Sequence, residues 1–251
     1  MADLVKLNSL LPAFREKFFH GEVPRFFRQV YKKHELIEAR RIGYHPNFHG
    51  QPLTNTDLLV HFSQKAQHTR DKVYGSLAFL PKFPGEYAYW LCMDLDNLQA
   101  VNAVFDRLIP IYEAYNIDYI WEHGEGGNRG HLWFMCDTPI KILRAFVNQL
   151  LDESRIDRTA YDIEIYPCHK DDNVIRLPCG YHVKTSKVYP ITYHNETSSN
   201  PVFMTESFIA AQSLSKEQIL KMLKRDIEPP ARKRNPDQVP FIYVPRNLPL
   251  P

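Results

Sequence analysis

Apolar side chains along the first 72 residues recur mostly at helical spacing. Between residues 10 and 41 they fall three or four positions apart on both sides of Pro24, a residue type that commonly begins a helix, so this range is predicted to be helical. Another helix is predicted from Thr54 to Ser63. We therefore expect residues 1–72 to form a mostly helical N-terminal part.

From residue 73 the pattern changes to short apolar runs that alternate with amphipathic segments. Strands are predicted over residues 73–80, 87–95, 117–122, 131–136, 160–166 and 174–177, and helices over 98–115 and 140–152. A strand-helix-strand-strand-helix-strand order is that of the split βαβ, or RNA-recognition-like, arrangement. The sequence thus predicts an α+β fold. Its catalytic core, residues 73–212, would contain the RNA-recognition-like lobe, and the N-terminal mostly helical α/β lobe would face it across a cleft.

Residues 213–251 are predicted to hold one helix and a tail. Ser215 and Gln218 form a capping box at the start of a helix that runs to Arg225. Seven prolines without helical periodicity follow between residues 228 and 251. This composition predicts an extended segment, which either lies on the core or leads to a further domain.

The composition limits how the chain could bind nucleic acid and in which cellular compartment it is expected. The formal net charge is only +2, so a grip on nucleic acid would have to come from local clusters of Lys and Arg. The four cysteines form no CxxC pair and are predicted to be reduced thiols. A secretory signal pattern is missing, and no apolar run approaches the roughly 20 residues of a membrane span. These features predict a cytoplasmic protein without membrane contact.

Candidate chemistry begins with two acids at the end of a predicted buried strand. Asp94 and Asp96 are separated by one residue, so in a strand their carboxylates project from the same face. Two ionised carboxylates that close repel each other unless a cation or a shared proton compensates. Hard divalent cations such as Mg²⁺ or Mn²⁺ are the obvious compensation. Alone, this pair is weak evidence, because glycosyltransferases carry it too.

Three further segments strengthen the metal and nucleotide interpretation. Four glycines between residues 124 and 130 precede His131, as in loops whose backbone amides approach a phosphate, although a plain hairpin turn is the alternative. Asp162 and Glu164 would share one face of the strand predicted over 160–166, and either one could complete a three-carboxylate site. The third segment carries basic side chains suited to phosphates. These are Arg176, His182, Lys184 and Lys187.

The order of these segments resembles the archaeo-eukaryotic primase superfamily. The features are an apolar strand with Asp-x-Asp, a Gly-rich run that ends in His, an acid-bearing strand and an Ile-Arg-Leu-Pro-x-Gly-x-His segment. The likeness extends over about residues 25–195, including His61 and the Gly-Tyr-His-Pro run at 43–46. It is closest to the primase-polymerases of mobile elements and CRISPR-associated operons.

This resemblance implies roles for individual residues. Asp94 and Asp96 match the first metal-binding pair, Glu164 or Asp162 the third acid, with Glu164 favoured, and His131 the histidine that contacts nucleotide phosphates. Two Mg²⁺ or Mn²⁺ ions would be the cofactors. DNA template, primer and dNTP or NTP would be the partners, with further domains, a helicase or CRISPR proteins as additional ones. The nucleotide-binding set comprises Asn128, Arg129, Gly130, His131, Arg176, His182, Lys184 and Lys187.

The chain departs from the superfamily in two places. Arg129 stands where a small residue is frequent, and no cysteine precedes Cys92, where relatives often carry a zinc knuckle. Cys168, His169, Cys179 and His182 are spaced unlike a zinc finger, which argues against a zinc site there. The expected activity is therefore DNA-directed nucleotidyl transfer, that of a primase-polymerase. An inert module that binds single-stranded nucleic acid is the alternative, and a sugar transferase would leave His131 and Arg176 unexplained.

Overall fold

The computed structural model describes residues 4–20, 26–32, 43–45, 53–65, 67–68, 72–79, 87–167, 175–182 and 185–223. Within these ranges the strands form one five-stranded and one seven-stranded sheet. The first sheet consists of β1 (Phe26–Lys32), β2 (Gly43–His45), β3 (Gln67–His68), β4 (Lys72–Phe79) and β9 (Ile175–Arg176). The second consists of β5 (Tyr87–Leu95), β6 (Ile120–His123), β7 (Gly130–Pro139), β8 (Ile163–Tyr166), β10 (Ile191–Tyr193), β11 (Glu196–Ser198) and β12 (Ser213–Ser215).

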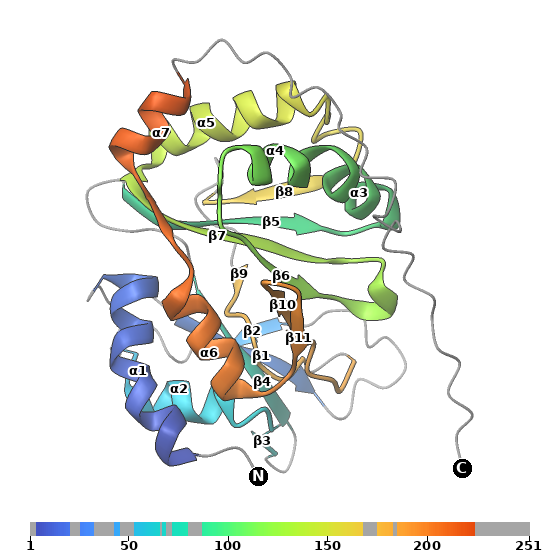
Figure 1. Ribbon diagram of the computed structural model, residues 1–251. Coiled ribbons are helices and arrows are strands. Elements are labelled where there is room, and N and C mark those ends of the chain that lie inside the picture. The colour runs from blue at the N-terminus through green and yellow to red at the C-terminus, as the bar shows by residue number, and fades with distance from the viewer. Residues whose placement is uncertain are drawn as a thin grey trace.

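Helices cover both faces of the second sheet (Figure 1). On one side lie α3 (Leu98–Ala103), α4 (Ile109–Ala114), α5 (Ile140–Glu153) and α7 (Lys216–Leu223). On the other side lie α1 (Leu4–Phe19), α2 (Asn55–Phe62) and α6 (Pro201–Ala210), together with the first sheet. The mixture of helices and sheets confirms the predicted α+β class.

The central strands of the second sheet run in the order β6-β7-β5-β8, with every neighbouring pair antiparallel. Because β7 lies between β5 and β6, the unit from β5 through α3 and α4 to β6 is a split βαβ. Further along β7, past the residues that pair with β6, β12 adds a parallel pairing at Met135–Asp137 that the sequence did not predict. Strands β10 and β11 and helix α6 were also missed.

Alternation along β5 divides the apolar core in two. Trp90 and Cys92 point to the face packed by α1 and α6, where Phe18 stacks on Trp90 at 5.4 Å between ring centroids. Leu91 and Met93 point to the other face and pack with the side chains of α3, α4 and α5. Asp94 continues the alternation of Trp90 and Cys92, so the candidate site opens at the end of the first face.

The helix predicted over residues 10–41 is wrong over residues 26–32. Leu4–Phe19 is a helix, but Phe26–Lys32 is a strand that pairs antiparallel with β4 along its length. The run from Phe26 to Tyr31 is rich in aromatic and β-branched residues, and this pairing outweighs its local helical spacing. The expected domain limits at residues 72 and 212 stay predictions.

The helices predicted over residues 54–63, 98–115 and 140–152 agree with the structure in position and type. Thr54 caps α2 through a reciprocal bond with Asp57, and Ser215 and Gln218 form the expected capping box before α7. The helix predicted over 98–115 contains a π-helical turn, Val104–Leu108, before Pro110. Proline lacks an N–H and crowds the carbonyl four residues earlier, and a wider turn accommodates both effects. The Pro-rich tail lies outside the described residues, and within them no helix is both long and apolar enough to cross a membrane.

Candidate active site

Four polar side chains lie in register across the second sheet. Glu164 on β8 is opposite Asp94 on β5, Asp94 is opposite His131 on β7, and His131 is opposite Glu122 on β6. Residues directly opposite in antiparallel strands place their side chains on the same face. We call these four residues the acid–histidine row. The row crosses four strands at the end of the face that carries Trp90 and Trp133.

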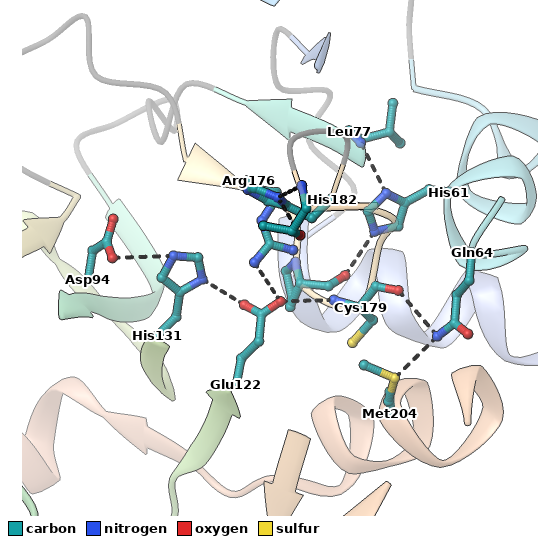
Figure 2. A network of polar contacts seen from close by, with 12 residues as sticks. His61, Gln64, Leu77, Asp94, Glu122, His131, Arg176, Cys179, His182 and Met204 are labelled. Carbon is teal, nitrogen blue, oxygen red and sulfur yellow. Dashed lines mark hydrogen bonds and ion pairs between the residues drawn. The ribbon is translucent and has the colours of Figure 1, made fainter. Parts of the chain in front are cut away.

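His131 is held between two carboxylates, as Figure 2 shows. Its Nδ1 lies 2.6 Å from Oε2 of Glu122, and its Nε2 lies 3.5 Å from Oδ1 of Asp94. Burial alone would lower the pKa of His131, but Asp94 and Glu122 raise this pKa to about 9. His131 is therefore an imidazolium at neutral pH, with a proton on each ring nitrogen to donate.

Glu122 is fully buried, and both of its carboxylate oxygens are engaged. Oε2 accepts from His131, while Oε1 accepts from Nη2 of Arg176 at 3.0 Å and from the backbone N–H of Cys179 at 3.3 Å. Burial would raise the pKa of Glu122, but Arg176, His131 and the Cys179 amide together hold it at about 2. Since Arg176 belongs to β9 of the first sheet, this ion pair joins the two sheets.

Glu122 was not among the site residues predicted from the sequence. A usable signal was present, however. Glu122 ends one strand of a hairpin and His131 begins the other, so both flank the glycine bend and face each other. A carboxylate that ends an apolar strand directly opposite a histidine is a candidate partner for that histidine.

Acids gather at the open end of β5. Burial would raise the pKa of Asp94, but His131 and Arg176 lower it. Asp96 follows the last residue of β5, and its pKa is raised by partial burial and by Asp94, with smaller contributions from Asp162 and Glu164 against the opposing charge of Arg129. The carboxylates therefore lie close enough to repel one another, as the sequence predicted for Asp94 and Asp96.

The strand predicted over 160–166 begins three residues later than expected, at Ile163. Asp162 lies in the preceding turn with φ 54°, so it does not share a strand face with Glu164. The turn forms because Asp157 accepts from the backbone N–H groups of Thr159 and Ala160, which competes with extension of the strand. Glu164 is the acid opposite Asp94, and it accepts from the Tyr166 hydroxyl at 2.6 Å.

Asn97 connects the two acidic segments and was missed by the sequence analysis. Its side-chain oxygen caps α3 by accepting from Ala100 N–H at 2.8 Å, and its amide donates to the carbonyl of Tyr161 at 2.9 Å. Tyr161 immediately precedes Asp162. One side chain thus fixes the end of β5, the start of α3 and the turn that carries Asp162.

The Gly-rich loop is a tight hairpin connection whose geometry itself requires glycine. Gly126 and Gly127 have φ of 67° and 72°. A Cβ on Gly130 would collide with the Glu122 carbonyl and the Trp121 ring. The glycines therefore do not by themselves indicate a phosphate site. Asn128 and Arg129 are exposed at the end of this loop, next to the site.

The predicted basic cluster is only partly assembled. Arg176 is buried and reaches the row through Glu122. His182 instead accepts from the Thr185 N–H at 3.3 Å, and Lys187 is exposed on the segment that pairs with His182. Lys184, Cys168 and His169 lie outside the described residues. Of the three predicted cations that the structure describes, Arg176 is the one with an ion pair to the row.

His61 supports this region from beneath. Its Nδ1 accepts from the backbone N–H of Leu77 at 3.0 Å, and its Nε2 lies 2.8 Å from the carbonyl of Pro178. An N–H can only donate and a carbonyl can only accept, so His61 is neutral with its proton on Nε2. It fixes the turn whose next residue, Cys179, binds Glu122.

The donor chemistry at the open end of β5 suits a divalent cation. Asp94, Asp96 and Glu164 offer the carboxylate oxygens that Mg²⁺ and Mn²⁺ prefer. Within the described ranges, however, no three His, Cys, Asp or Glu side chains are grouped as closely as a metal site requires. His131 contacts Oδ1 of Asp94 and Tyr166 donates to Oε2 of Glu164, and a carboxylate can accept such a bond while it also ligates an ion.

Comparison with known proteins assigns the family. No curated protein matches the chain. A family model described as the archaeo-eukaryotic primase domain of the TOTE conflict system matches residues 26–227. This match covers most of the chain and confirms the predicted superfamily, while the association with CRISPR operons stays a prediction. The chain belongs to the archaeo-eukaryotic primase domain family of TOTE conflict systems.

Proposed function

We propose that this chain is the catalytic core of a DNA primase-polymerase that adds nucleotides to a primer under the direction of a template. Membership in the archaeo-eukaryotic primase domain family favours nucleotidyl transfer as the reaction class. The observation that carries the proposal is the acid–histidine row. It puts Glu164, Asp94 and His131 side by side on one face, with Asp96 at the end of the same strand.

In the proposed reaction the primer 3′-oxygen bonds to the α-phosphorus of the nucleotide. The bond to the bridging oxygen breaks, pyrophosphate leaves and the hydroxyl proton passes to solvent. Asp94, Asp96 and Glu164 would hold two Mg²⁺ or Mn²⁺ ions. Such ions supply activation of the attacking hydroxyl and neutralisation of the charge on the phosphates.

His131 is the protein group best placed to meet the triphosphate. Its Nε2–H is only loosely engaged, at 3.5 Å from Asp94, whereas its Nδ1–H is tightly held by Glu122. A phosphate oxygen would take the Nε2–H bond and release Asp94. The loop through Arg129 and the segment with Lys184 and Lys187 would add positive charge around the phosphates.

The proposal extends to partners and place of action. DNA template, primer and dNTP or NTP would be the substrates. The protein would act in the cytoplasm of a prokaryote or from a mobile element, with further domains or a helicase beside it. Asp162, in the turn fixed by Asn97, would be a secondary acid near the site.

Primer extension tests the proposal directly. The purified chain with Mn²⁺, dNTPs and a primed template should extend the primer, and Asp94→Ala combined with Asp96→Ala should abolish extension. A matched double variant, Asp137→Ala with Asp152→Ala, removes two exposed acids away from the row and should retain it. Extension that survives loss of Asp94 and Asp96 would refute the metal assignment.

A second candidate function is an inert module that binds single-stranded nucleic acid. The observation that favours it is that, among the described residues, no three His, Cys, Asp or Glu side chains are grouped closely enough to hold a metal ion. This candidate predicts salt-sensitive strand binding that EDTA leaves unchanged, with no extension under any metal. Fluorescence anisotropy with a labelled oligonucleotide, with and without EDTA, separates the two candidates.

A further inference from the structure

We propose that Glu122 is a positioning residue that orients His131 and Arg176 for the nucleotide triphosphate. This inference rests on the proposed function, because it assigns the way in which the phosphate-binding groups of that same site are held. Glu122 itself lies beneath the row, fully buried, and would not touch the substrate.

Glu122 gathers donors from three separate segments. His131 reaches it from β7 and Arg176 from β9 of the other sheet, while the Cys179 amide comes from the turn after β9. All three groups donate, and an ionised carboxylate is the side chain that accepts from all of them at once. A glutamine of the same shape would present an NH₂ group to one of these donors and leave a buried polar group unsatisfied.

For His131, the bond at Nδ1 fixes which way the ring faces. The imidazole and the Trp133 ring meet in a T-shaped contact with 5.9 Å between centroids. With Nδ1 tied to Glu122, Nε2 is the nitrogen presented to Asp94 and to the open end of the site. The row therefore presents one defined donor toward the place where a phosphate would bind.

For Arg176, the ion pair fixes one end of the guanidinium and leaves the other end available. Nη2 binds Glu122 at 3.0 Å, while Nη1 is buried with no hydrogen-bond partner among the described residues. A buried guanidinium nitrogen without a partner is costly, and a ligand oxygen would relieve that cost. Glu122 thus holds His131 and Arg176, each with a further donor to offer.

A substitution series with nucleotide-binding readouts tests this role. We would measure the Kd of dATP by equilibrium dialysis, the KM and kcat for dATP in primer extension, and the ring N–H resonances of His131 by NMR. Glu122→Gln should raise Kd and KM at least tenfold with a smaller change in kcat. Glu122→Asp, which keeps the charge on a shorter side chain, should recover part of the loss. In the wild type the Nδ1–H proton of His131 should resonate far downfield, as expected for a short charge-assisted bond, and it should disappear in Glu122→Gln.

Two control variants separate positioning from stability. Leu150→Ala destabilises the core on the opposite face of the sheet and should lower the melting temperature without changing the KM for dATP. Glu153→Gln neutralises another partly buried glutamate, on α5, and should leave all nucleotide parameters unchanged.

The outcomes are separable from those of the proposed function. If the wild type binds dATP but extends no primer, the proposed function fails, while weaker binding by Glu122→Gln still supports the positioning role. If the wild type extends primers and Glu122→Gln has wild-type Kd and KM, the positioning role is overturned. If Glu122→Gln does not fold, the Kd and KM for dATP of Glu122→Asp are compared with those of the wild type, and wild-type values would again overturn the positioning role. A wild-type spectrum without the downfield His131 proton also overturns it.

Discussion

The two halves of the candidate site treat charge in opposite ways. In the buried half, which consists of Glu122, His131 and Arg176, each charge faces an opposite charge within hydrogen-bonding distance. The exposed half consists of Asp96, Asp162 and Glu164. Here Asp162 and Glu164 contribute to raising the pKa of Asp96, and Arg129 is the opposing charge. Asp94 stands between the halves, bound to His131 on one side and opposite Glu164 on the other.

This difference in charge pairing separates residues whose charges are paired within the fold from acids that are clustered at the surface. A buried charge must be paired when the chain folds, because its desolvation is otherwise too costly. An exposed cluster of like charges persists without a partner, and a bound cation would relieve its repulsion. We therefore expect substitutions in the buried half to affect stability, and those in the exposed half to affect chemistry.

The largest effect is expected from Glu122→Ala. It leaves His131 and Arg176 charged and buried without their shared partner, which should lower the free energy of unfolding by about 3–5 kcal/mol. Asp96→Ala in the exposed half should change that free energy by less than about 0.5 kcal/mol, because its side chain is exposed. Urea unfolding of the two variants beside the wild type measures this contrast. Equal losses in both variants would erase the distinction between the halves.

The next effect is the dependence of stability on pH. The pKa of Glu122 is held at about 2, below its ordinary value of 4.5, so its contribution is present above pH 4.5 and is lost as the pH falls toward 2. The pKa of His131 is raised from 6.5 to about 9, so its contribution is full below pH 6.5 and is lost as the pH rises through 9. The free energy of unfolding should therefore be highest between about pH 4.5 and 6.5.

Urea titrations at closely spaced pH values test this profile. In Glu122→Gln the acid-side loss should shrink, because the group that must be protonated is gone. The alkaline loss should begin at a lower pH, since His131 then keeps only Asp94 as a partner. A variant profile parallel to that of the wild type would show that the buried half does not govern the pH dependence.

Short-range patterns let the sequence predict the framework of this site. Alternation placed Asp94 on the correct face of β5, and the helices on either side of the β6–β7 hairpin were located within a few residues. The capping residues Thr54 and Ser215 were readable because each bonds to a residue three positions away. Order along the chain, together with Asp94, His131 and Arg176, was enough to predict the superfamily.

Long-range contacts are what the sequence could not supply. Glu122 matters because β9, 54 residues later, brings Arg176 against it, and no local pattern encodes that approach. Strand β1 resembles a helix until β4 pairs with it. Asp162 was predicted to share a strand face with Glu164, but bonds to Asp157 fold this stretch of the chain into a turn. In each case a contact with a residue distant in sequence, or a competing turn, outweighed the local spacing of apolar residues on which the prediction was based.

A moderate effect is expected at the junction between the halves. Asn97→Ala removes the cap of α3 and the bond to Tyr161, and should lower the free energy of unfolding by about 1 kcal/mol. It should also weaken primer extension, because the turn with Asp162 is no longer tied to the end of β5. Asn97→Asp restores the cap but cannot donate to Tyr161, so it should recover stability more than activity. Unfolding and extension measured on the same preparations separate these two bonds.

The smallest effect on stability, and the most telling about the exposed half, is expected from Asp96→Asn. The pKa of Asp96 is raised, which means that its ionised form is disfavoured in the folded protein. The neutral amide of asparagine should therefore stabilise the metal-free protein. The gain should be less than about 0.5 kcal/mol because the side chain is exposed. Saturating Mn²⁺ should raise the melting temperature of the wild type, since an ion that binds only the folded state stabilises it. In Asp96→Asn that rise should be largely absent, whereas Asp137→Asn on the outer part of β7 should keep it. Calorimetry with and without Mn²⁺ makes this comparison. An equal rise in melting temperature in Asp96→Asn and in the wild type would mean that a bound cation does not act by relieving the repulsion among the exposed acids.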